Sequence, residues 1–343
     1  MPESSEKYFT QKEEEKSPEE IKEKKALALA EEIKKIKERI KKEGETVEGY
    51  QEIIELAHKI EKLYKKEIIG WEKEGKLTEK DVLAEYQAEE TVWAANFSPE
   101  GDKVVIGSND GMMRVISLIE KEKDKPRVLA EYQAGGRVWS ANFSPEGDKV
   151  VIGSDDGMMR VISLTEKDKP RVLAEYQAGG WIYAANFSPE GDKVVIGSDN
   201  GMVRIISLTE KGKPKVLAEY QAGGGVNAAN FSPEGDKVVI GSDDKMMRVI
   251  SLIEKEKGKP KVLAEYQAGG WIYAANFSPE GDKIVIGGDD KMMRVISLTE
   301  KENGKPKVLA EYQAGGAVHA ANFSPEGDKV VIGSDDGMMR VIG

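Results

Sequence analysis

The chain has 343 residues, of which 39% are hydrophobic and 33% are charged, and its formal net charge is −11. It contains no cysteine, which excludes disulfides, thiolate metal sites and cysteine nucleophiles, and its two histidines argue against a His-based metal or catalytic site. The acidic balance argues against nucleic-acid binding, and no apolar run approaches the ~18 residues of a membrane span. We therefore expect a cytoplasmic protein with no membrane or nucleic-acid partner, no metal and no cofactor.

The N-terminal part of the chain is rich in Lys and Glu and poor in Gly. Residues 1–16 have few apolar side chains to bury, so we expect them to be disordered. A helix is predicted to begin at Ser17, which is followed by Pro and two Glu, the residues favoured in a first helical turn. A second helix is predicted from about Thr46 to about Trp71, and the short connection makes residues 17–81 an α-helical hairpin. Its leftover apolar face packs either on the rest of the chain or on a second copy, by homo-oligomerisation through residues 17–74.

From Val82 onward the sequence repeats itself. The segment Asn-Phe-Ser-Pro-Glu-Gly-Asp-Lys begins at Asn96, Asn142, Asn186, Asn230, Asn276 and Asn322. The offsets are 46, 44, 44, 46 and 46 residues, a period typical of the four-stranded blades of a propeller. Within one repeat, strands are predicted at Val128–Gln133, Val138–Ser144, Lys149–Gly153 and Met158–Leu164. The predicted fold is an all-β six-bladed β-propeller over residues 82–343, preceded by the α-helical hairpin.

The two ends of the repeat array are complementary. It opens with a strand at Val82–Gln87 that has no preceding partners, and it ends on Met338–Ile342, which lacks the fourth strand of its blade. Pairing of these two strands would complete the sixth blade and remove an open sheet edge, which is otherwise an aggregation hazard. We therefore predict a closed ring.

The repeat at Val138–Leu164 and its five copies resemble the WD-repeat β-propeller family. That family has Phe-Ser-Pro-Asp-Gly, then Ser-Gly-Ser-x-Asp-x-Thr-Val-Arg, then Trp-Asp; this repeat has Phe143-Ser144-Pro145-Glu146-Gly147 and a similar second segment that ends at Arg160. Gln133-Ala134 stands where the family has Gly-His, and Ile162-Ser163 stands in place of Trp-Asp. The resemblance implies the same strand pattern without the family's His–Ser–Asp–Trp hydrogen-bond network, and with six blades rather than seven.

No motif of enzymatic chemistry is present. The chain has neither a phosphate-binding loop nor a Gly-x-Ser-x-Gly nucleophile elbow. Most Asp and Glu residues recur identically in each repeat, which indicates that they belong to the blade rather than to one active centre. We therefore predict that the chain is not an enzyme.

The repeats differ mainly at two positions, two residues apart, beside the strand that would line the central channel. The pairs are Thr91/Trp93, Arg137/Trp139, Trp181/Tyr183, Gly225/Asn227, Trp271/Tyr273 and Ala317/His319, and they include four of the five Trp. Residues two apart on a strand point to the same side, and in WD-repeat proteins these positions lie at the channel mouth. Variation on one face of a constant scaffold is typical of a recognition surface. The predicted ligand-binding residues are all members of these pairs except Gly225 and Ala317. The alternative is that their side chains simply fill the channel.

A ring of acidic turns is the second candidate. Asp110, Asp156, Lys245 and Lys291 belong to turns that would form the rim of the same site. The alternative is that Asp-Asp-Gly is only a good β-turn, with the recurring Arg, such as Arg114, as a structural partner of the acids.

The function predicted from these patterns is a recognition or scaffold module that binds a protein or peptide on the channel-mouth face. Two alternatives stay open: a designed or purely structural repeat protein with no natural ligand, and a glycan or other small ligand bound by the aromatic mouth. The near-identity of the blades fits either recent expansion of a natural array or design.

Overall fold

The computed structural model describes Lys35 and residues 85–122, 125–165, 170–208, 213–256 and 259–343. The chain divides into two units, Met1–Val82 and Leu83–Gly343. In the first unit only Lys35 is described, as an exposed residue of an α-helix. The predicted disorder of residues 1–16, the helical hairpin at 17–81 and the oligomerisation surface at 17–74 otherwise lie outside the described residues.

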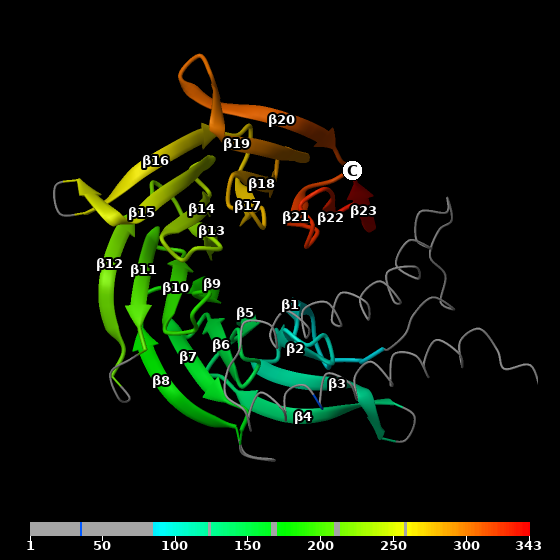
Figure 1. Ribbon diagram of the computed structural model, residues 1–343. Helices are drawn as coiled ribbons and strands as arrows, with labels where there is room; N and C mark the ends of the chain where they lie inside the picture. Colours follow the sequence, from blue (N-terminus) through cyan, green and yellow to red (C-terminus); the bar gives the residue numbers. More distant parts are fainter. Residues whose placement is uncertain (1–34, 36–84, 123–124, 166–169, 209–212, 257–258) are drawn as a thin grey trace, which may run out of the picture. The chain divides into compact units, whose positions relative to one another are not determined.

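Six antiparallel sheets form the second unit as the blades of a propeller around a central axis (Figure 1). From the axis outward, the first strands are β1 (Val92–Phe97), β5 (Val138–Phe143), β9 (Ile182–Phe187), β13 (Val226–Phe231), β17 (Ile272–Phe277) and β21 (Val318–Phe323). The second strands are β2 (Lys103–Ser108), β6 (Lys149–Ser154), β10 (Lys193–Ser198), β14 (Lys237–Ser242), β18 (Lys283–Gly288) and β22 (Val330–Ser334). We number the blades one to six in this order.

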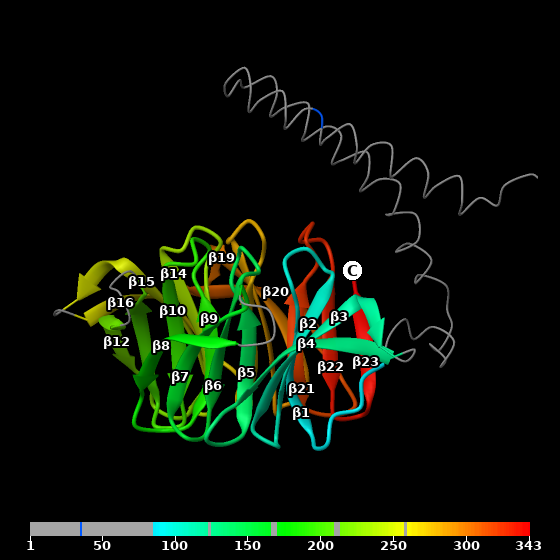
Figure 2. The same ribbon diagram turned by 90° about the horizontal axis from the view of Figure 1, so that it is seen from below.

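The third strands are β3 (Met112–Glu122), β7 (Met158–Ser163), β11 (Met202–Ser207), β15 (Met246–Glu256), β19 (Met292–Glu302) and β23 (Met338–Ile342). The fourth, outermost strands are β4 (Lys125–Gln133), β8 (Arg171–Gln177), β12 (Lys215–Gln221), β16 (Lys259–Gln267) and β20 (Lys305–Gln313). Figure 2 shows the blades from the side. The predicted six-bladed all-β propeller is confirmed.

The core lies between neighbouring blades. In β6, Val150, Val151 and Ile152 are all fully buried, because both faces of the sheet are covered. Val151 belongs to one cluster with Ile182 of blade three, whereas Val150 and Ile152 face blade one. Gly153 continues this strand because a Cβ there would lie 2.5 Å from Ile182 Cγ2. A continuous apolar run in the sequence is therefore a strand buried on both sides.

Most blades hold their third strand with an ionic network in place of the family network that the sequence lacks. In blade two, Met158 N donates to Asp156 Oδ1 at 2.8 Å, and Ser154 Oγ donates to the same oxygen. Arg160 pairs with Asp156 at 2.7 Å and with Glu175 of the fourth strand at 3.1 Å. In the five blades whose turn carries this acid, the recurring arginine is its structural partner, as predicted; blade three has Asn200 at that place.

In the described residues, blades six and one share no core cluster, whereas each of the other five pairs of neighbouring blades does. Tyr86 and Ala88 pack on Ile106 and the rest of its cluster, as Tyr132 and Ala134 do in the next interface. However, Glu85–Gln87 do not lie in a strand, and within the described residues β23 pairs only with β22. Residues 82–84 lie outside the described residues. The closing pairing of Val82–Gln87 with Met338–Ile342 is thus not made by Glu85–Gln87 here, and Val341 is 58% exposed while its counterpart Val161 is 1% exposed.

We expect Gln87→Cys combined with Met338→Cys to form an intrachain disulfide, because Gln133 lies directly opposite Met112 at the same two positions of blade one. Opposed residues of antiparallel strands have Cα atoms about 4.5–5.5 Å apart, within disulfide range. The chain has no cysteine of its own, so non-reducing electrophoresis and mass spectrometry read the product directly. Met112→Cys with Gln133→Cys is the positive control. Free thiols or intermolecular disulfides in the test variant, with the control closed, would contradict ring closure.

Acid should destabilise the propeller through its aspartates. Burial opposes ionisation of Asp156, but hydrogen bonds from Ser154, Met158 and Arg160 outweigh it and hold the pKa of Asp156 below its usual value. Burial likewise opposes ionisation of Asp148, and Lys149 and Ser144 lower its pKa. An Asp whose pKa is lower in the folded than in the unfolded protein stabilises the fold at pH values above its unfolded pKa of about 3.9. This stabilisation is lost as the pH falls through the folded pKa. We expect the free energy of unfolding in urea to fall by ~1 kcal/mol or more below pH ~4, and by less in Asp156→Asn.

Candidate functional site

The second variable position of every blade is the extra residue of a β-bulge. In blade two, Val138 pairs with Ser154 and Ser140 with Gly153, so Trp139 has no partner of its own. The same register shift occurs in all six blades, at Trp93, Trp139, Tyr183, Asn227, Tyr273 and His319. A bulge bends the strand and redirects the side chain of its extra residue. Sequence analysis found these residues by their variation but gave no sign of the bulge.

The first variable position is bonded to the acidic turn of its own blade. Asp199 N donates to Trp181 O at 3.0 Å, and Asp289 N donates to Trp271 O at 2.9 Å. The equivalent bond occurs in the other blades, including Asn109 N to Thr91 O at 2.8 Å. The variable pair and the first residue of each turn, an Asp in all blades but the first, therefore form one continuous surface, which we call the channel mouth.

Aromatic side chains from three consecutive blades touch one another at the channel mouth. The ring centroids of Trp93 and Trp139 are 4.6 Å apart, with an interplanar angle of 43°. Trp139 meets Tyr183 edge-on at 5.5 Å, and Trp181 meets Tyr183 at 6.4 Å. The structure thus brings the predicted aromatic residues of blades one to three into one arc.

Polar contacts interrupt the aromatic ring in the other three blades. Asn227 Nδ2 donates to Asp243 Oδ1 at 2.7 Å and to Ile272 O at 3.2 Å. Tyr273 stacks on His319 at 4.6 Å, and His319 Nε2 lies 2.9 Å from Asp335 Oδ1. The mouth is therefore asymmetric around the axis, with Asn227 between two aromatic groups.

The four mouth tryptophans differ in how much of each side chain is exposed to solvent. Trp93, Trp181 and Trp271 are 46–49% exposed. Trp139 is half-buried between Trp93 and Tyr183, and its Nε1 is buried with no hydrogen-bond partner in the described part of the chain. Three of these rings face solvent, and only Trp139 packs as an interior side chain does.

The channel mouth is acidic, with one cation close to the aromatic arc. Burial raises the pKa of Tyr183, and the carboxylates of Asp199, Asp243 and Asp155 raise it further. The guanidinium carbon of Arg137 lies 6.0 Å from the Trp139 ring centroid, and Arg137 Nε lies 3.6 Å from Asp155 Oδ2.

The four predicted rim residues have different roles. Asp110 accepts from Met112 N at 2.8 Å and pairs with Arg114 at 2.7 Å, as Asp156 does with Arg160. These two acids are thus engaged in the blade network, and the first acid of each turn is the one beside the variable pair. Lys245 and Lys291 are exposed, with positive φ values of 68° and 66° where most blades have Gly.

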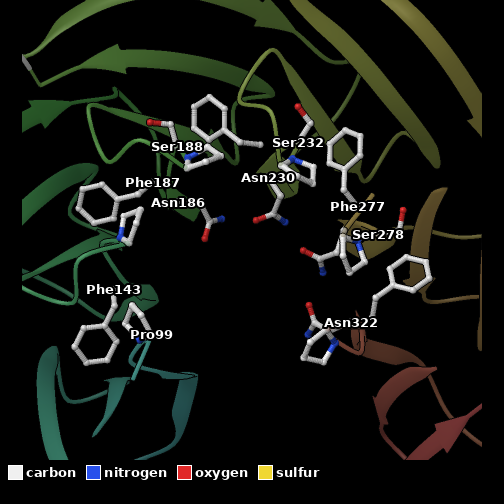
Figure 3. Close-up of a pocket in the computed structure, with 18 of the residues that line it drawn as sticks. Pro99, Phe143, Asn186, Phe187, Ser188, Asn230, Ser232, Phe277, Ser278 and Asn322 are labelled. Carbon is white, nitrogen blue, oxygen red and sulfur yellow. The ribbon is translucent and has the colours of Figure 1, made fainter. Parts of the chain in front are cut away.

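Below the mouth, the channel continues to a second opening. A cavity of about 300 Å³ is lined by Tyr183, Asn227, Tyr273, His319 and the recurring Asn and Ala residues. At the opposite end, a hollow of about 560 Å³ is lined by the recurring Phe-Ser-Pro segments. Figure 3 shows the amides of Asn186 and Asn230 nearer its centre than the rings of Phe187 and Phe277. Asn186 Nδ2 donates to Ala229 O of the next blade, and the equivalent Asn amides tie the inner strands of blades one to six to their next neighbour in order.

No group of three or more His, Asp or Glu side chains in the described residues could hold a metal ion. No helix within the described part of the chain is long and apolar enough to cross a membrane.

Replacing the two turn lysines by glycine should stabilise the propeller. A non-glycine residue at positive φ carries backbone strain of ~1 kcal/mol or more, which glycine does not. A Cβ at the equivalent Gly157 would also lie 2.6 Å from Gln177 Nε2. We expect Lys245→Gly and Lys291→Gly each to raise the free energy of unfolding by ~0.5–1 kcal/mol, measured by urea denaturation. The reverse change, Gly201→Lys, should lower it by a similar amount; a neutral result for all three would show that the turns carry no strain.

A family model described as WD domain, G-beta repeat matches the chain six times, at residues 80–117, 126–163, 171–207, 214–251, 260–297 and 306–342. The second match, 126–163, runs from the outer strand β4 of blade one through the first three strands of blade two. None of the curated proteins compared with the chain matches it. The six matches together span more than half of the residues, and each contributes three strands to one blade of a six-bladed propeller. The chain belongs to the WD40 family.

Proposed function

We propose that this protein is a non-catalytic recognition module that binds a protein or peptide partner at the channel mouth. Propellers of its family commonly serve as protein-interaction scaffolds. The observation that carries the proposal is the bulge. The inner strands vary most at the bulged residue, which has no partner in the neighbouring strand.

The bulge separates what folds the blade from what varies. On either side of Trp139, Val138 is fully buried and Ser140 is 7% exposed. On either side of Tyr183, Ile182 and Ala184 are buried in the same way. The flanking residues build the core between blades, so the bulged residue can change without altering that core. This supports a role for the variable residues outside folding.

The exposed residues are of the types that dominate binding energy. Trp and Tyr are enriched among interface hot spots, because a large ring gains contact area while few torsions are fixed. Trp181 and Trp271 present nearly half of their surface to solvent beside half-buried Tyr183 and Tyr273. A partner that covers these rings would bury apolar surface that stays exposed to solvent in the folded protein.

Truncating Trp181 should weaken binding and leave the fold intact. Loss of a hot-spot aromatic costs ~2 kcal/mol or more of binding free energy, so we expect Trp181→Ala to weaken the affinity for the partner about thirtyfold. The melting temperature should stay nearly unchanged because Trp181 is 46% exposed. Trp139→Ala should lower both affinity and melting temperature, since this ring packs between Trp93 and Tyr183. Partners recovered by affinity capture with the wild-type protein supply the ligand for the affinity measurement.

Leu217→Ala is the matched control, because Leu217 is 44% exposed on the outer strand β12. It should change neither affinity nor melting temperature substantially. A partner that binds Trp181→Ala and Trp271→Ala as tightly as the wild type would refute the channel mouth as the binding surface. A glycan that binds where no protein does would favour the small-ligand alternative.

A further inference from the structure

Arg137 is a cation of the channel mouth that lies beside both an aromatic ring and a carboxylate. Its guanidinium lies over the Trp139 ring, 6.0 Å from the centroid, and its Nε is 3.6 Å from Asp155. A cation beside both an aromatic face and a carboxylate is attracted by the ring quadrupole and by the opposite charge. In blade two, the chain itself supplies this cation.

Blades three and five have the same acid without a cation. Trp181 and Trp271 occupy the position of Arg137, and Asp199 and Asp289 occupy that of Asp155. Both carboxylates are exposed, and within the described residues neither has a hydrogen-bond or ion-pair partner for its side chain. Each is bonded through its backbone to the carbonyl of the exposed tryptophan beside it.

The other blades do not repeat this combination. In blade four, Asp243 accepts a hydrogen bond from Asn227, and in blade six Asp335 lies 2.9 Å from His319. Blade one has the neutral Asn109, which donates to Glu90 at 2.5 Å. An unpartnered acid next to an exposed tryptophan and a half-buried tyrosine therefore occurs only in blades three and five of the described mouth.

We propose that these two places are subsites for the cationic side chains, arginine or lysine, of a basic peptide partner. The subsites are Trp181–Tyr183–Asp199 and Trp271–Tyr273–Asp289, and Arg137 fills the related place in blade two. This inference rests on the proposed function, because it names the chemistry of the partner at the same surface.

The same aspartates that would attract a cation also raise the pKa of the two tyrosines. Burial raises the pKa of Tyr273, and Asp289, Asp243 and Asp335 raise it further, in parallel with Tyr183 and its three aspartates. The two subsites are unequal, since Lys291 follows Asp289 by two residues whereas Gly201 stands at that place in blade three. Blade three is the stronger subsite.

The test uses two capped tripeptides, acetyl-Gly-Arg-Gly-amide and its citrulline analogue, which has nearly the same shape and no charge. Binding is followed by calorimetry and by tryptophan fluorescence at low salt. We expect a preference of about fivefold or more for the arginine peptide, decreasing as salt is added. Equal binding of the two peptides would overturn the proposal.

Point variants locate the subsites. Asp199→Asn should weaken the binding of the arginine peptide about threefold or more, and Asp289→Asn should weaken this binding less. Glu190→Gln is the control, because it removes the same charge from an exposed turn that carries no tryptophan. Unchanged binding in both aspartate variants, or an equal loss in the control, would contradict the assignment.

Arg137→Ala should increase the binding of the arginine peptide about twofold to fivefold, because it frees Trp139 and Asp155 for the ligand. Arg127→Ala removes the same charge from an exposed residue that pairs with Glu120 on the outer hairpin, and it should have no such effect. No gain in Arg137→Ala would show that Arg137 does not occupy a cation subsite.

The two proposals fail separately. A partner that is lost in Trp181→Ala while arginine and citrulline bind equally would sustain the recognition function and overturn the cationic subsites. Arginine-selective binding that depends on Asp199, without any partner that depends on Trp181, would sustain the subsites and overturn the macromolecular function.

Discussion

Packing of one blade on the next is the interaction on which this structure depends. A single sheet with the sequence Val-Val-Ile in its second strand would expose an apolar face on each side. The propeller covers both, so that Val150 and Val151, on opposite faces of one strand, are each fully buried. Glycines such as Gly153 permit the close approach, and the Asn142 amide links the inner strands of neighbouring blades at 2.9 Å. The open faces of blades six and one show the cost of a missing neighbour, because Val341 and Phe97 are the exposed counterparts of buried or half-buried residues.

Near-identical blades can carry an asymmetric surface because the bulge removes one residue per blade from this packing. The ladder resumes at Ser140 or its equivalent, and the strand pairing is the same whether the bulged residue is Trp139, Asn227 or His319. The acidic turns show the same division of labour. The second acid, such as Asp156, is bound to Ser154 and Arg160 within the blade, while the first lies beside the variable pair. The two adjacent aspartates therefore have different roles, because their side chains point in different directions.

Charge and aromatic surface converge at one end of the channel. Carboxylates from three turns act on Tyr183, and a guanidinium already lies on Trp139. At the other end, the invariant Phe-Ser-Pro segments surround the opening in the same way in each blade. The two ends therefore differ: residues that recur in every blade surround the Phe-Ser-Pro opening, whereas residues that vary between blades form the channel mouth.

Much of this could be read from the amino-acid sequence. The mid-forties repeat, the short apolar runs and the turn residues determined the six blades and their strand order, and comparison of the repeats found the variable pairs, because these signals are local and recur six times. Three features required the tertiary structure. The bulge at Trp139 depends on how two strands pair, the burial of Trp139 against the exposure of Trp181 depends on neighbours from other blades, and the separation of Asp155 from Asp156 depends on where each side chain points. The bulge and the two aspartate environments arise when strands and turns of one blade pair, and the burial of Trp139 arises only when neighbouring blades are brought together around the axis.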